Sequence, residues 1–135
     1  MRENGIVQRK LALLDEYLVS LSNELTDVNM ETFADSWAMQ RMTERALQTM
    51  IEIVIDVAER IIAVKGAGPI ASSAEAMERL VTLGILKSAT PYTEMVRFRN
   101  LIVHQYEQID PRLLYQLATE KLDAFRCFRD EIDRA

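Results

Sequence analysis

The sequence between Ala46 and Val64 reads ALQTMIEIVIDVAERIIAV. Its apolar residues recur every three or four positions, as they do on a helix, and they form two stripes rather than one. A helix with apolar residues on two sides must be covered on both sides, so this helix should lie at the centre of the fold. The stripes consist of Leu47, Ile51, Val54, Ala58, Ile61 and Ile62 on one side, and of Ala46, Met50, Ile53, Val57 and Val64 on the other.

Capping residues and helix-ending residues divide the rest of the chain. A heptad pattern marks the first helix, a Ser72/Glu75 capping box opens a short helix, and Thr90-Pro91 and Asp110-Pro111 each open another. These signals predict an all-α, up-and-down bundle of about five helices that forms one domain over residues 1–135. The predicted helices run from about Asn4 to Leu25, from between Asn29 and Ser36 to Val64, from Ser72 to Leu83, from Thr90 to about Tyr106, and from Pro111 to about Ile132.

Composition narrows the class of protein. The chain has 135 residues, 49% of them hydrophobic, which suffices for a real core. Its net charge of -5 argues against a general nucleic-acid binder, because such proteins present a basic face. The single cysteine, Cys127, excludes an internal disulfide. No uninterrupted signal-peptide core or membrane-spanning stretch is present, so we expect a cytoplasmic protein without membrane contact.

The only histidine lies in the stretch Arg99-Asn100-Leu101-Ile102-Val103-His104-Gln105-Tyr106. Arg99, Asn100 and His104 should point away from the core. An imidazole can exchange a proton near neutral pH, and a guanidinium binds phosphate oxygens bidentately, so these side chains suit phosphodiester chemistry. Asn100 could orient either group. The core face of this helix is predicted to consist of Met95, Phe98, Leu101 and Ile102.

Two further valines, Val96 and Val103, fall among these polar residues. A helix with one buried face does not need them. We therefore expect a second buried surface, covered by another helix or by another copy of the chain, and a site built at that interface.

Three carboxylates, Glu52, Asp56 and Glu59, share a face of the central helix. They could hold a metal, but such a run is more often a solvated strip whose members pair with nearby basic residues. We expect one of them to pair with Arg99 or to orient His104. No metal or other cofactor is predicted, because one histidine and one cysteine without a neighbouring carboxylate cluster do not make a protein metal cage.

The pattern Arg-Asn-x-x-x-His-x-Tyr, within the run from Glu94 to Tyr106, resembles the signature of the HEPN superfamily, specifically the HepT-like toxins of HEPN/MNT pairs. The run from Glu52 to Ile62 is also close to the family pattern, and the similarity extends from about Glu44 to the C-terminus. The resemblance implies a metal-independent ribonuclease that acts as a homodimer. It also implies an MNT-type nucleotidyltransferase antitoxin as partner.

The resemblance assigns roles to four residues. His104 would be the general base or acid, and Arg99 would stabilise the phosphorane, with Asn100 positioning both. Tyr106 would contact substrate RNA and would be the residue that the antitoxin adenylylates. Two alternatives remain: a non-catalytic HEPN interaction or nucleotide-binding module partnering a nucleotidyltransferase, or a structural role in which Arg99 and His104 only pair with carboxylates on the helix surface.

Overall fold

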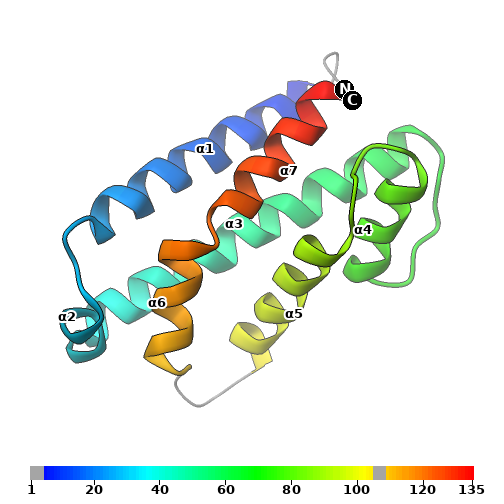
Figure 1. Ribbon diagram of the computed structural model, residues 1–135. Helices are drawn as coiled ribbons and strands as arrows, with labels where there is room; N and C mark the ends of the chain where they lie inside the picture. Colours follow the sequence, from blue (N-terminus) through cyan, green and yellow to red (C-terminus); the bar gives the residue numbers. More distant parts are fainter. Residues whose placement is uncertain (1–4, 105–108) are drawn as a thin grey trace.

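The computed structural model describes residues 5–104 and 109–135 (Figure 1). This part of the chain contains seven helices and no strand, which confirms the predicted all-α bundle. None of the described helices is long and apolar enough to cross a lipid bilayer. The helices are α1 (Gly5–Leu25), α2 (Met30–Asp35), α3 (Trp37–Val64), α4 (Ser73–Thr82), α5 (Thr90–His104), α6 (Pro111–Glu120) and α7 (Asp123–Arg134).

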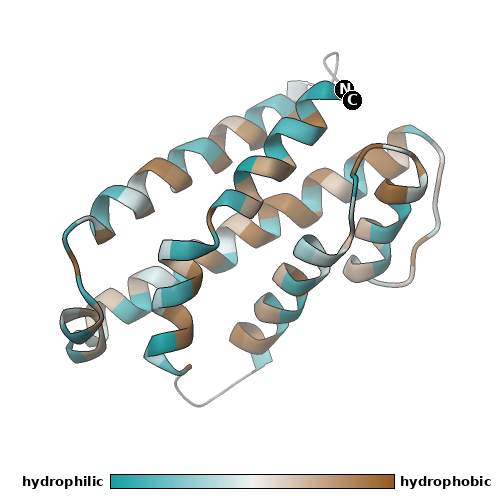
Figure 2. Ribbon diagram, viewed as in Figure 1, coloured by the Kyte–Doolittle hydropathy of each residue, from teal (hydrophilic) through white to brown (hydrophobic). Residues whose placement is uncertain are grey.

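Helix α3 is central, as its two apolar stripes predict. It contacts every other helix, and Figure 1 shows α1 and α5 on either side of it. Hydrophobic residues lie along its second half, where Figure 2 is brown over most of the ribbon. Both stripes are buried from Leu47 to Ile62, whereas Val64, the last residue of the helix, is 63% exposed. The heptad residues of α1 are also buried: Val7, Leu11, Leu14, Leu18, Leu21 and Leu25.

The helix count differs from the predicted number at two places, and the first is Ser36. Its extended backbone separates α2 from α3, and its hydroxyl oxygen accepts a hydrogen bond from the Met39 N–H (3.1 Å). The buried amide of Gln40 donates to the carbonyl oxygens of Phe33 (3.1 Å) and Ala34 (3.0 Å). These bonds satisfy carbonyl oxygens at the end of α2 and a backbone N–H at the start of α3. The short helix α2 therefore precedes the central one.

The second difference lies between α6 and α7, which were predicted as one continuous helix. Neither Gly nor Pro marks the break, and Leu122 within it is buried. Helix α6 packs on α1, α2 and α3, whereas α7 packs on α3 and also bonds to α5 through Glu131 and to α1 through Arg129. The break lets the two segments follow different neighbours, a tertiary requirement that helix periodicity does not report.

The start of α5 is held in place by turns and by α7. Gly84, with φ of 78°, follows the end of α4, and α5 begins at Thr90 as predicted. The Ala89 carbonyl accepts from the Thr93 N–H (2.9 Å) and closes the first turn of the helix. The carboxylate of Glu131 accepts hydrogen bonds from the Lys87 N–H (3.0 Å) and the Tyr92 hydroxyl (2.7 Å). These two bonds tie the beginning of α5 to the C-terminal helix.

Candidate active site on helix α5

Helix α5 buries a different arc from the predicted one. Val96, predicted to face a second surface, is 4% exposed and belongs to the chain's own core, as do Tyr92 and Met95. Leu101, predicted to face the core, is 39% exposed, and Val103 is 47% exposed. The predicted arc was therefore rotated around the helix, because Tyr92 was not counted as a core residue. Its ring is buried, and its hydroxyl donates to the half-buried carboxylate of Glu131.

Arg99 lies half-buried between α5 and α3. Its Nε donates a hydrogen bond to the Oδ1 of Asn100 (2.9 Å), and its Nη1 lies 4.0 Å from the Oε2 of Glu52 on α3. Glu52 is thus the carboxylate of the central helix that pairs with Arg99, which the sequence left undecided. The two contacts hold the guanidinium on the α3 side of the helix.

His104 is the last described residue of α5, and its side chain is exposed. It lies four positions after Asn100, so both residues share one side of the helix, and both line an open groove between α5 and α6. We call this hollow the α5 groove. It is lined by Glu94, Arg97, Phe98, Asn100, Leu101 and His104 of α5 and by Leu113 and Leu117 of α6.

Arg99 is absent from the lining of the α5 groove. His104 comes five positions after Arg99, which places the two side chains roughly 140° apart around the helix axis. Asn100 connects the two sides, because its amide bonds Arg99 while its position faces the groove. Tyr106, the remaining predicted site residue, lies outside the described residues.

The other two carboxylates of the predicted acidic face have separate surroundings. The Oδ2 of Asp56 lies 2.5 Å from the Nζ of Lys10 and 3.6 Å from the Nε of Arg60. Burial alone would raise the pKa of the Asp56 carboxyl, but the hydrogen bond and charge of Lys10, with help from Arg60, lower it overall. Glu59 is exposed. Within residues 5–104 and 109–135, no three His, Cys, Asp or Glu residues are placed to hold a metal ion.

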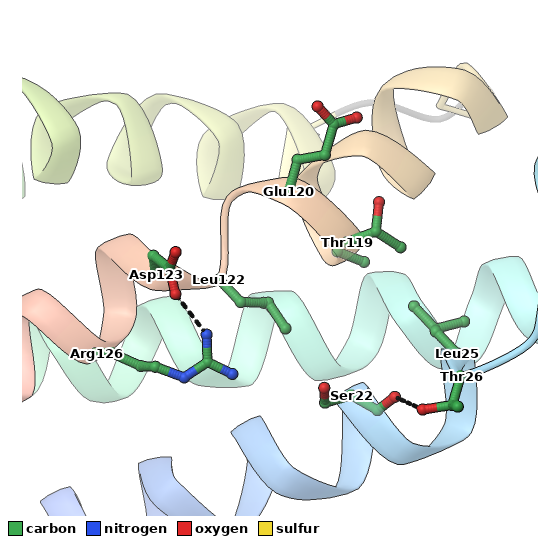
Figure 3. Close-up of a pocket in the computed structure, with 9 residues that line it drawn as sticks. Ser22, Leu25, Thr26, Thr119, Glu120, Leu122, Asp123 and Arg126 are labelled. Carbon is green, nitrogen blue, oxygen red and sulfur yellow. Dashed lines mark hydrogen bonds and ion pairs between the residues drawn. The ribbon is translucent and has the colours of Figure 1, made fainter.

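A separate polar hollow lies at the junction of α6 and α7, beside the end of α1 (Figure 3). Its one guanidinium, from Arg126, already pairs with Asp123 at 2.7 Å, and the Thr26 hydroxyl donates to the carbonyl oxygen of Ser22. None of the predicted site residues lines it. The α6 side of the α5 groove, formed by Leu113 and Leu117, was also not predicted, because no local motif marks which helix will face α5.

A family model and a curated relative both indicate a HepT-like protein. Residues 8–132 match the family model described as ribonuclease HepT-like. The tRNA nuclease HepT of Aphanizomenon flos-aquae (strain 2012/KM1/D3) is 25% identical over 136 aligned positions, which cover 97% of this chain and 90% of that protein.

Two solved structures have the same fold. One is a tri-AMPylated HEPN toxin of Shewanella oneidensis in complex with an MNT antitoxin, with a TM-score of 0.89, 22% identity, and coverage of 98% of this chain and 99% of that one. The other is YutE, a cytosolic protein of unknown function from Bacillus subtilis, with a TM-score of 0.79, 20% identity, and coverage of 95% and 86%.

Proposed function

Because the chain belongs to the ribonuclease HepT-like family, we propose that it is a metal-independent endoribonuclease and the toxin of a HEPN/MNT toxin–antitoxin pair. The observation that carries the proposal is the arrangement on α5. His104 and Asn100 face an open groove, and Asn100 also bonds Arg99. Asn100 thus bonds the phosphate-binding group and lines the same groove as the proton-transfer group.

The proposed reaction is cleavage by the ribose 2′-hydroxyl. A base removes the proton of that hydroxyl, its oxygen attacks the adjacent phosphorus, and an acid protonates the departing 5′-oxygen, leaving a 2′,3′-cyclic phosphate. His104 acts as base or acid, and the Arg99 guanidinium stabilises the negative charge on the phosphorane. Asn100 positions the Arg99 guanidinium through the 2.9 Å hydrogen bond.

A homodimer follows from this chemistry. The chain has one histidine, yet the reaction needs both a base and an acid, so two chains that share one cleft would supply one imidazole each. Leu101 and Val103, which come three positions and one position before His104, are exposed apolar residues of the kind that a second copy would cover. Val103→Asp should therefore give a monomer by light scattering and abolish cleavage; a variant that stays dimeric and active would remove this surface from the interface.

Regulation by a nucleotidyltransferase antitoxin is the second part of the proposal. The Shewanella relative, an AMPylated toxin bound to an MNT antitoxin, supports it. We infer that Tyr106, two positions after His104 in the sequence, is the adenylylated residue, because the attached AMP would bring an anion that competes with RNA phosphate for Arg99. The protein would act in the cytoplasm, where RNA and the antitoxin are found. Peptide mass mapping after co-expression with the antitoxin, with Tyr106→Phe as control, tests this assignment.

The activity itself is tested with purified protein, tRNA and chelator. Cleavage should proceed in EDTA, and His104→Ala should lower its rate by roughly a hundredfold or more with an unchanged helical spectrum. Gln48→Ala, on α3, is a control that should cut normally. If the parent protein cuts no RNA but binds the antitoxin, the non-catalytic interaction module, which the net charge of -5 also favours, becomes the better account.

A further inference from the structure

A second hollow adjoins the α5 groove on the same side of the helix. Glu94, Phe98 and Leu117 line both hollows, so the two are immediate neighbours. The second hollow reaches inward to Leu47 and Ile51 of α3. We call it the Phe98 pocket, because the half-buried Phe98 ring lies at the boundary between the two.

The break between α6 and α7 gives this pocket its far wall. Leu117 comes from α6, Ala124 and Phe125 come from α7, and Lys121 lies between the two helices. The pocket encloses about 460 Å³, within the range of sites that take small organic molecules. The geometry that sequence periodicity failed to predict therefore creates a cavity next to the candidate active site.

The lining of the pocket combines an apolar interior with a polar rim. Phe98, Met95 and Phe125 offer apolar and aromatic surface, whereas the rim carries the carboxylate of Glu94 and the ammonium group of Lys121. A carboxylate accepts hydrogen bonds and an ammonium donates them. A flat aromatic ring with donors and acceptors along its edge satisfies both parts of this lining, and nucleobases have that structure.

The negative net charge of the protein also favours a site that binds nucleobases. With 21 acidic and 16 basic residues, the chain cannot draw most of its RNA affinity from contacts between phosphates and a broad basic face. Stacking of bases on aromatic side chains is the other main source of affinity for single strands. In an acidic ribonuclease, a stacking pocket beside the catalytic groove would supply RNA affinity that phosphate contacts do not.

We propose that the Phe98 pocket binds one nucleobase of the substrate RNA while the ribose whose 2′-hydroxyl reacts lies in the α5 groove beside His104. This inference rests on the proposed ribonuclease function and adds a determinant of where the strand is cut. Phe98 supplies the stacking surface, and Glu94 and Lys121 read the edge of the base.

Saturation-transfer NMR on the whole protein tests the pocket without requiring catalysis. The probes are AMP, CMP, GMP and UMP, with ribose 5-phosphate as the probe that lacks a base. At least one nucleotide should show saturation of its base protons, and ribose 5-phosphate should show no comparable signal. Ala124→Phe, which fills the pocket without touching Arg99 or His104, should remove the base signal and raise the KM for RNA cleavage roughly tenfold.

The matched control is Ala12→Phe on the exposed side of α1, which should retain both nucleotide binding and the parental KM. If Ala124→Phe does not fold, Glu94→Ala with Glu24→Ala as its control repeats the comparison at two exposed positions. Here the expected loss of base signal is partial, because stacking on Phe98 remains.

The outcomes separate this inference from the proposed function. RNA cleavage by the parent without any nucleotide signal, or with an unchanged KM in Ala124→Phe, overturns the base pocket alone. Nucleotide binding that Ala124→Phe removes, in a protein that cuts no RNA, overturns the ribonuclease function and leaves a nucleobase site. Loss of antitoxin binding in Ala124→Phe, with no nucleotide bound by the parent, makes the pocket a protein-docking site and overturns the inference.

Discussion

The two halves of helix α5 differ in almost every physical respect. Its first half is fixed: Tyr92, Met95 and Val96 are buried, and Glu131 of α7 accepts the Tyr92 hydroxyl hydrogen. Its second half carries Asn100, Leu101, Val103 and His104, all exposed. The buried first half thus fixes the helix in the fold, and the second half presents the candidate site residues to solvent. Stability and activity should therefore respond to different substitutions.

The largest effect is expected in the anchored half. Met95→Ala should lower the free energy of unfolding by about 2 to 5 kcal/mol, because it removes a buried side chain and leaves a cavity. Leu101→Ala, on the same helix but 39% exposed, is the matched control and should change stability much less. Urea unfolding of both variants gives the comparison, and equal losses would mean that the two halves are packed alike.

The next largest effect is expected on the rate of RNA cleavage, from a substitution in the second half of α5. Arg99→Ala should lower RNA cleavage roughly a hundredfold, about 2.7 kcal/mol, because the phosphorane loses its cationic partner. Arg99→Lys should restore little of this, since a point charge does not reproduce the planar fork. The melting temperature should stay near that of the parent. Arg45→Ala, an exposed arginine of α3, serves as the control for loss of charge; a similar loss of activity there would point to general RNA attraction instead.

A smaller effect is expected at the anchor between α5 and α7. Tyr92→Phe should reduce stability by about 1 to 2 kcal/mol, because the Glu131 carboxylate loses one of its hydrogen-bond donors. Catalysis per folded molecule should not change, so kcat measured well below the melting temperature separates anchoring from chemistry.

This anchor also predicts a pH dependence. Burial, together with the hydrogen bond and charge of Glu131, raises the pKa of Tyr92. The native state then keeps the phenolic proton at pH values where the unfolded chain releases it, so this contribution is present below about pH 10 and is lost as the pH rises above it. Urea unfolding from pH 8 to 11 should show a steeper decline for the parent than for Tyr92→Phe, and identical slopes would contradict the burial of a neutral Tyr92.

The smallest effect is expected at the contact between Arg99 of α5 and Glu52 of α3. Glu52→Gln should lower cleavage a few-fold and change stability by less than about 1 kcal/mol, because Glu52 is half-exposed and 4.0 Å from Arg99. The expected change lies in kcat, since Glu52 positions the guanidinium and does not touch RNA. Glu59→Gln removes a carboxylate from the same helix without an Arg99 contact, and it should leave kcat unchanged.

Local sequence signals were reliable over distances of about one helical turn. The spacing of apolar residues in Ala46–Val64 predicted the central helix and its double coverage, and the caps Ser72 and Asp110 lie where their residue types indicated. The arginine, asparagine and histidine of the proposed site were predicted from their order along the chain, and their roles stay a prediction. Each of these signals depends on residues within three to seven positions, which a helix brings together regardless of the rest of the fold.

Contacts between helices could be decided only by packing. The sequence placed Leu101 on the core face and Val96 on a second buried surface, whereas Leu101 is 39% exposed and Val96 belongs to the chain's own core. Apolar residues cover a wide arc of α5, so a rotation of the helix exchanges one edge of that arc for the other. The break at Leu122, the pairing of Glu52 with Arg99 and the position of the Phe98 pocket next to the α5 groove likewise depend on which helix lies next to which. The sequence by itself therefore determined the residue types of the proposed site. The side of the helix on which each of them lies was decided by how the helices pack.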